Sequence, residues 1–207
     1  MSLAQFLLTA LIAYLIGSFS SGIFVSALKG RDIRKEGSKS SGATNVTRVL
    51  GPSYGLVTFL GDFLKSALAL GAGYVIAGLN GALAASVFTV IGHNWPIYYQ
   101  FQGGKGIVCS VAVVLLICPA EAGIAGAATI LIIWLTRYVS VGSLSFLALS
   151  ALLLIIRRGM VPYGWWSLIL LALGLFQHRS NIARLLNGTE NKFSLKRKSS
   201  GESIKQL

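Results

Sequence analysis

Long apolar runs alternate along the chain with short polar segments that are rich in glycine. A helix that crosses the hydrocarbon core of a bilayer needs about 20 predominantly apolar residues, and fewer where neighbouring helices shield it. The runs therefore predict an all-α integral membrane protein in which residues 1–191 form one domain of seven transmembrane helices. The expected ranges are 4–28, 53–78, 80–93, 105–118, 120–136, 140–156 and 161–178.

The composition supports this class of protein. Hydrophobic residues make up 54% of the chain and charged residues 12%, against about a quarter charged in soluble domains. Lipid accepts apolar side chains on the outside, whereas a soluble protein would have to bury them. Cys109 and Cys118 lie in apolar runs and are interpreted as small core residues. No group of Cys, His or carboxylate residues has metal-site spacing, so no metal and no other cofactor is predicted.

The basic residues predict the orientation in the membrane. Seven crossings put fifteen of the 18 Lys and Arg residues on one side, against Arg157 and Arg158 on the other and Lys65 within a span. Lys and Arg gather on the cytoplasmic side, which predicts an N-terminus outside and a C-terminus in the cytoplasm. The basic polar stretch 192–207 is predicted to form a cytoplasmic tail. Topology thus explains the basic excess, and no nucleic acid is expected as a partner.

A first polar constellation lies between residues 29 and 52, where glycines alternate with hydroxyl side chains. Glycine-rich backbone can turn several N–H groups toward one anion. Ser38 to Ser41 are expected to cap a helix that starts near Ala43, and on it Thr44 and Arg48 share a face, with Asn45 beside them. The alternative interpretation is a capped amphipathic helix on the membrane surface.

A second constellation combines Gly103, Gly104 and Gly106 with Lys105, just before an apolar helix. Exposed N–H donors, a positive helix end and a mobile cation suit a phosphate. The segment is not a Walker A loop, because Tyr99 stands where that motif needs glycine. A flexible loop with one cytoplasmic lysine is an equal explanation.

The third constellation follows the last predicted helix. His178, Asn181 and Arg184 recur every three residues, so a continuing helix presents them on one face. A basic helix end that reaches for the membrane surface is the alternative. Within the spans, Asp62 and Lys65 are three residues apart, and they are either functional or a pair that locks helix packing.

All three constellations fall on the predicted cytoplasmic side. Charge asymmetry does not require glycines, amides and hydroxyls to accompany the cations, whereas a shared anionic ligand does. Two rival interpretations remain: a transporter of organic phosphates, whose internal repeats the sequence lacks, and a non-catalytic lipid-binding subunit. Neither histidine begins a His-x-x-x-x-Asp motif, and there is no Gly-x-Ser-x-Gly segment.

Several unusual motifs occur in a fixed order from about Gly17 to Phe193. They are Gly17-Ser18 with Ser21-Gly22, Asp32-Ile33-Arg34-Lys35, Gly37-Ser38, Gly42-Ala43-Thr44-Asn45-Val46-x-Arg48, Gly61-Asp62-x-x-Lys65, Gly92-His93-Asn94-Trp95-Pro96, Gly103-Gly104-Lys105-Gly106, Arg137-Tyr138-Val139-Ser140, His178-Arg179-x-Asn181-Ile182-x-Arg184 and Gly188-Thr189-Glu190. In these motifs the chain resembles the bacterial acyl-phosphate:glycerol-3-phosphate acyltransferases, the PlsY family. It departs from the family pattern at Ser20, where proline is usual, and at Lys39, where glycine is usual.

The resemblance implies an enzyme of the bacterial cytoplasmic (inner) membrane, with its active site facing the cytoplasm. The enzyme would transfer a fatty acyl group from acyl phosphate to the 1-hydroxyl of sn-glycerol 3-phosphate, giving lysophosphatidic acid and phosphate. This reaction is the first acylation of phospholipid synthesis. Besides these two substrates, membrane lipids are the expected partners, and no obligate protein partner is inferred.

Roles for individual residues follow as a hypothesis. Lys105 and the glycine-loop amides would hold a substrate phosphate, while His178 and Asn181 would orient glycerol 3-phosphate. Either His178 or a substrate phosphate would take the proton of the attacking hydroxyl. The expected catalytic residues are His178, Lys105, Arg48 and Asn181. The expected substrate-binding residues are Ser38, Thr44, Asn45, Gly103, Gly104, Gly106, Ser143, Arg184 and Glu190.

Overall fold

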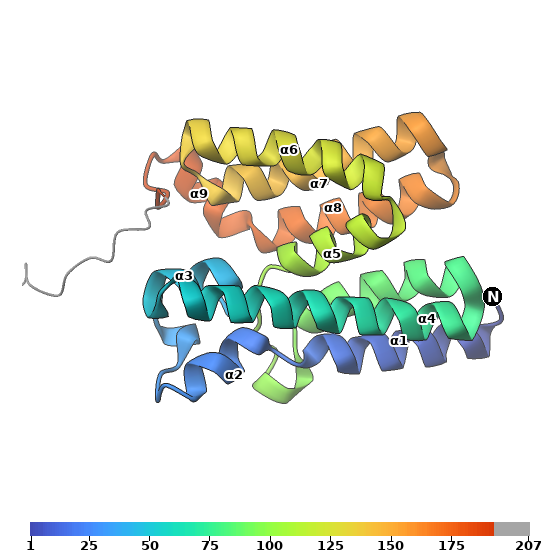
Figure 1. The fold of residues 1–207 in the computed structure, drawn as a ribbon, viewed down its shortest axis with the longest axis horizontal. Helices are drawn as coiled ribbons and strands as arrows, with labels where there is room; N and C mark the ends of the chain where they lie inside the picture. The colour runs from blue at the N-terminus through green and yellow to red at the C-terminus, as the bar shows by residue number, and fades with distance from the viewer. Residues whose placement is uncertain (193–207) are drawn as a thin grey trace, which may run out of the picture.

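The computed structural model describes residues 1–192, and the regular structure in that range is helical throughout. Two layers of helices lie against each other, one containing α1 and α4 and the other α6, α7 and α8, with α5 between them (Figure 1). The predicted tail lies outside the described residues except for Lys192. The helices are α1 (Leu3–Ser18), α2 (Ser21–Ala27), α3 (Ala43–Leu50), α4 (Pro52–Asn94), α5 (Ile107–Ile117), α6 (Pro119–Thr136), α7 (Val139–Arg158), α8 (Trp165–Gln177) and α9 (Arg179–Leu186), with single turns η1 (Ile33–Lys35), η2 (Ile97–Tyr99) and η3 (Met160–Gly164).

Five helical segments among the described residues are long and apolar enough to cross a membrane. These are Leu3–Ala27, Pro52–Tyr99, Pro119–Thr136, Val139–Arg158 and Met160–Gln177, and α5 is a shorter apolar helix. The predicted class, an all-helical integral membrane protein, is therefore confirmed. The count of seven crossings and the orientation of the termini stay predictions.

Helix α4 turns back on itself near its middle. Ala77 and Gly78 have non-helical backbone angles, and Gly78 has a φ of 58°. The two runs on either side of this turn pack closely, because a Cβ added to Gly73 would lie 2.5 Å from the Gly81 carbonyl oxygen. The break predicted between ranges 53–78 and 80–93 is thus present, and glycine permits both the turn and the close approach.

Two local predictions were wrong. The range predicted as one helix, 4–28, is broken at Phe19, whose backbone is extended. Ser20 then begins α2, because its side chain accepts a hydrogen bond from the Ile23 N–H at 3.4 Å. Helix α3 starts at Ala43 as expected, but no serine side chain caps it, and the residue before it is Gly42.

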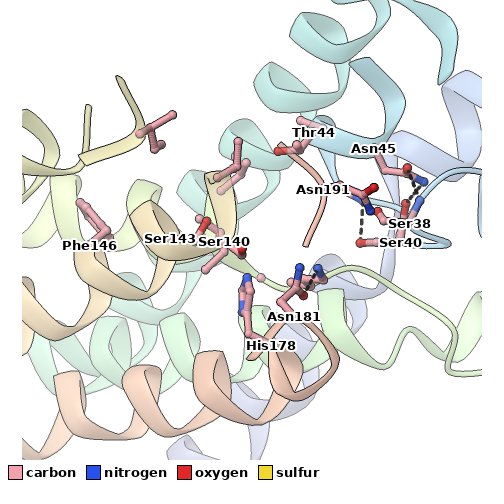
Figure 2. Close-up of a pocket in the computed structure, with 18 of the residues that line it drawn as sticks. Ser38, Ser40, Thr44, Asn45, Ser140, Ser143, Phe146, His178, Asn181 and Asn191 are labelled. Atoms are coloured by element: carbon pink, nitrogen blue, oxygen red, sulfur yellow. Dashed lines mark hydrogen bonds between the residues drawn. The ribbon is translucent and has the colours of Figure 1, made fainter. Parts of the chain in front are cut away.

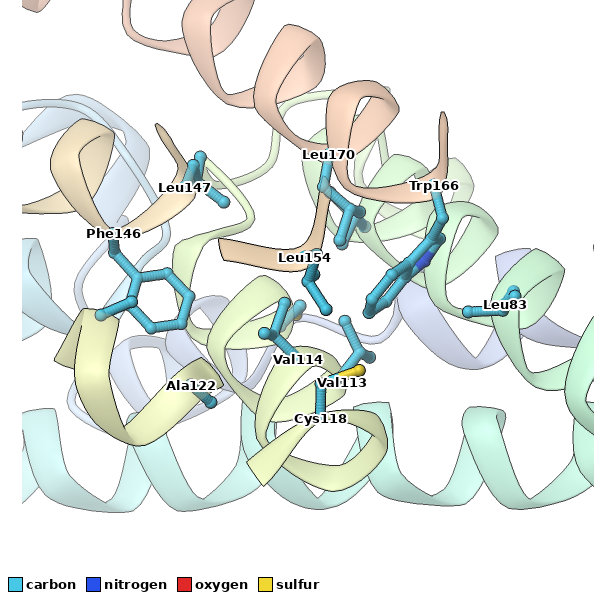
Figure 3. Packing of buried hydrophobic residues seen from close by; sticks show 13 residues of the cluster. Leu83, Val113, Val114, Cys118, Ala122, Phe146, Leu147, Leu154, Trp166 and Leu170 are labelled. Carbon is cyan, nitrogen blue, oxygen red and sulfur yellow. The ribbon is translucent and has the colours of Figure 1, made fainter. Parts of the chain in front are cut away.

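The largest apolar core joins α5 to α7, α8 and the second run of α4 (Figure 3). Both cysteines are wholly buried in this core, which confirms their prediction as core residues. Helices α7 and α8 approach closely where Leu147 fills the space in which a side chain at Gly174 would lie. This packing holds the first turn of α7 and the last turn of α8 at the same end of the domain. The labelled members of the core are Leu83, Val113, Val114, Cys118, Ala122, Phe146, Leu147, Leu154, Trp166 and Leu170.

Candidate functional site

A cavity of about 220 Å³ lies at the end of the domain where α3 and α9 are found (Figure 1, Figure 2). Its polar wall comes from the loop before α3, the segment before α5, the first turns of α7, and residues 178–191. Segments that are far apart in the sequence therefore meet at one place. Of the predicted site residues, eleven line this cavity: Ser38, Thr44, Asn45, Arg48, Lys105, Gly106, Ser143, His178, Asn181, Arg184 and Glu190.

Lys105 is tied to the C-terminal segment through Asn181. The Lys105 Nζ donates to Asn181 Oδ1 at 2.5 Å, and Asn181 Nδ2 donates to Glu190 Oε1 at 2.7 Å. The spacing of His178, Asn181 and Arg184 predicted a continuing helix, and α9 carries two of the three, while His178 is the junction between α8 and α9. The predicted second and third constellations are thus one hydrogen-bonded network.

Glu190 is the centre of that network. Its carboxylate also accepts from Ser140 Oγ at 3.0 Å and from Arg184 Nε at 2.7 Å. Burial opposes ionisation of Glu190, but the hydrogen bonds from Asn181, Arg184 and Ser140 outweigh it and hold its pKa below the usual value. The charged carboxylate therefore fastens α9 to the first turn of α7.

Positive charge exceeds negative charge in this network. Within residues 1–192, neither Arg48 nor Lys105 forms an ion pair with a carboxylate. Burial lowers the pKa of Lys105 to about 8, and the neighbouring charges of Arg184 and Arg48 act in the same direction, while Glu190 opposes them. A lysine with a lowered pKa gains most from an anion that restores a favourable environment for its charge.

His178 is buried and held in one orientation. Its Nδ1 lies 2.8 Å from the Gly174 carbonyl oxygen. A carbonyl can only accept, so Nδ1 carries the proton and Nε2 keeps a free lone pair in the neutral ring. Burial, with repulsion from Lys105, lowers the pKa of His178 to about 4 despite the bond to Gly174. The imidazole is therefore neutral near pH 7 and offers an acceptor.

Asn45 lines the cavity as predicted, but its side chain is bonded within its own loop. Its Nδ2 donates to the carbonyls of Glu36 at 3.0 Å and Ser40 at 2.9 Å, and its Oδ1 accepts from the Ser38 N–H at 2.8 Å. Arg48 Nη1 reaches the same oxygen at 3.4 Å. The amide is thus occupied by its own loop, and Asn45 shapes the wall that Ser38 and Ser40 line rather than offering free groups to a ligand.

The glycine loop also differs from the prediction. The Gly104 N–H donates to the His93 carbonyl at 3.0 Å, and neither Gly103 nor Gly104 lines the cavity. A Cβ at Gly103 would lie 2.1 Å from the His93 carbonyl oxygen, so these glycines permit close packing. Of the predicted loop, Gly106, with a φ of 75°, and Lys105 reach the cavity.

Ser143 and Thr44 line the cavity as predicted, but among residues 1–192 neither side chain donates to the Lys105 network (Figure 2). Ser140, one turn earlier than Ser143, donates to Glu190 of that network instead. Both serines face the same way because α7 places residues three apart on one side. The sequence pattern alone does not show which of the two serines donates to Glu190.

Part of the wall was missed altogether. Below the cations the wall becomes apolar, with Ile107 and Val111 from α5, Ile133 from α6 and Phe146 from α7. Ile107 and Val111 are four residues apart on the helix that Lys105 precedes, which was the available signal. The structure also brings Asp62 and His93 to the wall, as well as Ser40 and Asn191.

The fold and the cavity together define a helical membrane protein with a buried, cation-rich site that adjoins an apolar wall. Residues 7–188 match the family model described as glycerol-3-phosphate acyltransferase. The chain therefore belongs to the glycerol-3-phosphate acyltransferase (PlsY) family.

Individual relatives agree with this membership. The glycerol-3-phosphate acyltransferase of Thermoanaerobacter sp. (strain X514) is 45% identical over 190 residues, which cover 91% of this chain and 96% of the relative. That of Halalkalibacterium halodurans is 43% identical over 197 residues, covering 89% and 94%. The crystal structure of PlsY, an integral membrane glycerol 3-phosphate acyltransferase, in its glycerol 3-phosphate form superposes with a TM-score of 0.86 at 34% identity, covering 91% and 96%.

Proposed function

We propose that this protein transfers a fatty acyl group from acyl phosphate to the 1-hydroxyl of sn-glycerol 3-phosphate, producing lysophosphatidic acid and phosphate. The observation that carries the proposal is the meeting of Arg48, Lys105, Arg184 and His178 in one cavity with an apolar wall. Related proteins named glycerol-3-phosphate acyltransferase support the acceptor. A solved PlsY in a lysophosphatidic acid form, with a TM-score of 0.84 at 33% identity, supports the product.

The charge in the cavity suits two phosphorylated substrates. Two phosphates brought together repel each other, and this repulsion is offset where several cations and hydrogen-bond donors surround both. Arg48, Lys105 and Arg184 provide three cations against the single charge of Glu190, since Asp62, which also lines the cavity, is paired with Lys65. The surplus of two positive charges favours a pair of phosphoryl groups over a single carboxylate.

The apolar wall suits an acyl chain. Ile107 and Val111 are half-buried, as is Ile133 across from them, whereas Phe146 is buried. Residues of this kind on α5, α6 and α7 give a hydrocarbon tail a place beside the cations without exposure to water. An acyl phosphate, which is anionic at one end and apolar at the other, matches both parts of the cavity.

The reaction requires one bond to form and one to break. The 1-hydroxyl oxygen of glycerol 3-phosphate attacks the acyl carbonyl carbon, and the bond from that carbon to the phosphate oxygen breaks. Phosphate leaves with the electron pair, and the hydroxyl proton is balanced by protonation of a phosphate. Lys105 and Arg48 would stabilise the negative charge that develops on the leaving phosphate, and holding both substrates in contact supplies much of the remaining acceleration.

The geometry around His178 favours a substrate phosphate as the final proton acceptor. Its imidazole has a pKa of about 4, lowered by burial and by the charge of Lys105, so it is a weak base. Its Nε2 lone pair remains suited to accept a hydrogen bond from the attacking hydroxyl. We therefore assign His178 to orientation of that hydroxyl, and the proton to a phosphate.

The proposal includes the topology in the membrane. Seven crossings, counting both runs of α4 and the short α5, would put the cavity on the cytoplasmic side, with the N-terminus outside and the C-terminus inside. Support comes from the basic residues that gather at the cavity end of the domain, among them Arg48, Lys105 and Arg184. The opposite end of α7 carries Arg157 and Arg158. The bacterial inner membrane is the corresponding location, since acyl phosphate would reach the cavity from the cytoplasm.

The test is an assay with both substrates. Purified protein in detergent receives a sixteen-carbon acyl phosphate and glycerol 3-phosphate, and free phosphate and lysophosphatidic acid are measured together. We expect the two products in equal amounts, and no phosphate above background when glycerol 3-phosphate is omitted. Acyl-CoA and acyl carrier protein thioesters are tested as donors in parallel. Failure to form lysophosphatidic acid from acyl phosphate would overturn the proposal.

A further inference from the structure

Asp62, Lys65 and His93 form a buried polar cluster beside the cavity, and the proposed reaction gives them no role. All three residues are at most 4% exposed. Asp62 and His93 contribute to the cavity wall, while Lys65 lies behind it. Ionisable groups within the apolar part of a membrane protein are costly to bury, so they point to a function that compensates for the cost.

Lys65 joins the end of α1 to the imidazole of His93. Its Nζ lies 3.0 Å from the Gly17 carbonyl oxygen, 2.6 Å from that of Phe19 and 2.9 Å from His93 Nδ1. Asp62 Oδ1, at 3.1 Å, is the counter-charge. The same His93 nitrogen lies 3.6 Å from Asp62 Oδ1, so the imidazole packs against both members of the charged pair. The two carbonyls belong to a helix end, where such groups lack partners within the helix.

His93 in turn fixes the segment that leads to Lys105. Its carbonyl accepts the Gly104 N–H at 3.0 Å. Its ring lies so close that a Cβ at Gly104 would be 2.1 Å from Nε2. Gly104 directly precedes Lys105, whose Nζ bonds Asn181 in the cavity. A continuous set of contacts therefore runs from Lys65 through His93 and Gly104 to the cation of the site.

We propose that Lys65 is a positioning residue, which orients the His93 ring and thereby holds the segment before Lys105 in the place where Lys105 meets a phosphate. The inference rests on the proposed function only for the identity of the phosphate. The competing explanation is that Asp62 and Lys65 merely neutralise each other. That explanation predicts that removing both charges together leaves phosphate binding unchanged.

The first experiment removes both charges at once. Lys65→Met alone would leave Asp62 unpaired in the membrane domain, so the variant of choice is Asp62→Asn with Lys65→Met. We expect a melting temperature close to that of the unaltered protein. The affinity for glycerol 3-phosphate, measured by calorimetry without any acyl donor, should fall about tenfold or more, as expected when a charged group loses its position. An affinity within twofold of that of the unaltered protein would overturn the inference.

The control is a second ion pair, between the buried Glu121 and the exposed Arg158, at the far end of α7. Glu121→Gln with Arg158→Met removes the bond between Arg158 Nε and Glu121 Oε1, which is 3.0 Å long. This double variant tests the cost of losing an ion pair without any path to Lys105. We expect its affinity for glycerol 3-phosphate to stay within twofold. An equal loss of affinity in both double variants would show a general effect of destabilisation and would overturn the inference.

A second pair of variants keeps both charges and alters the link between them and the loop. His93→Asn places an amide oxygen near the position of Nδ1, so Lys65 keeps an acceptor, whereas His93→Leu leaves it none. At equal melting temperatures, His93→Asn should bind inorganic phosphate about tenfold more tightly than His93→Leu. Equal affinities in the two variants would overturn the inference. Because these readouts need no acyl transfer, they remain decisive if the proposed acyltransferase activity fails.

Discussion

Two carboxylates at opposite ends of α7 are both bound to arginine, yet their surroundings differ. Glu121 is 1% exposed and receives two hydrogen bonds from Arg158, at 3.0 and 3.3 Å, with Arg157 as a more distant partner. Its arginines reach the surface, so any charge left over is neutralised by solvent or lipid headgroups. The ion pairs of Glu121 therefore need no further ligand, and they join α6 to α7.

Glu190 is instead surrounded by donors that face a cavity. Ser140, Asn181 and Arg184 all bond to it. Arg48 and Lys105 line the same cavity, and neither is paired with a carboxylate from residues 1–192. This contrast separates a structural ion pair from a binding site. Around Glu121 the charges are balanced by groups of the protein and its surroundings, whereas around Glu190 the surplus positive charge is balanced only when an anion binds.

The largest expected effect concerns the cation of the cavity. Lys105→Ala should lower kcat/KM by about a thousandfold, because the variant loses charge stabilisation that acts mainly in the transition state. The melting temperature should not fall, since a buried charge is removed along with the bond to Asn181. Phosphate release from both substrates is the measurement. Activity within tenfold of the unaltered enzyme would contradict the assignment and favour a lipid-binding role.

Replacing each carboxylate by its amide tests whether Glu190 and Glu121 differ in their importance for activity. Glu190→Gln should cost about 10- to 100-fold in kcat/KM, because Asn181 and Arg184 lose a charged partner. Glu121→Gln should leave activity within twofold and cost roughly 1 kcal/mol in free energy of unfolding, since its arginines remain solvated. Steady-state kinetics and thermal melting of both variants decide the matter. Loss of activity in Glu121→Gln would contradict the assignment of Glu121 to structure and Glu190 to the binding site.

The pH dependence of kcat/KM should follow the protonation of Lys105. Burial gives Lys105 a pKa of about 8, so the charge needed for phosphate binding is present below pH 8 and lost above it. We expect kcat/KM to fall about tenfold per pH unit beyond that point. The fall in kcat should come at higher pH, because a bound phosphate raises the pKa of the lysine. In Lys105→Arg the guanidinium stays protonated above pH 8. If kcat/KM of this variant falls over the same pH range, the fall is caused by another group.

Replacement of His178 should have a smaller effect. His178→Gln retains hydrogen-bonding groups but no titratable base, so activity should remain within about tenfold if a substrate phosphate takes the proton. Single-turnover rates of acyl transfer provide the measurement. A loss of about a thousandfold in a folded variant would instead identify the imidazole as an obligatory base. His178→Leu, which lacks polar groups, serves as the reference for loss of orientation.

The smallest expected effect lies in the loop before α3. Lys39 has a φ of 57°, in the left-handed region that favours glycine. Lys39→Gly removes a strain of about 1–2 kcal/mol, and the greater freedom of glycine in the unfolded chain offsets roughly half of that. A rise in melting temperature of a few degrees with unchanged kcat is expected. A decrease in kcat/KM would show that the Lys39 side chain also contacts substrate.

Much of the fold followed from the spacing of apolar residues. Runs of apolar side chains predicted the helices to within a few residues, and they also predicted a break within α4. The break at Phe19 was missed because the short segment of serines and glycines around it lies within a run that is otherwise apolar. Lys65, which bonds the carbonyls of Gly17 and Phe19 from another helix, and Ser20, which caps α2, make an interruption there favourable.

The sequence by itself determined the class of protein and the residue types of the site, because lipid selects apolar helices and phosphate selects cations with glycines. Tertiary structure alone decided the part that each polar group takes. Asn45 and Gly104 are residue types that commonly bind anions, but their hydrogen bonds are made within the protein. Ser140, rather than Ser143, donates to Glu190. These choices depend on which groups of the chain lie within about 3 Å of a donor, a property of the folded loops and packed helices that the order of residues alone does not contain.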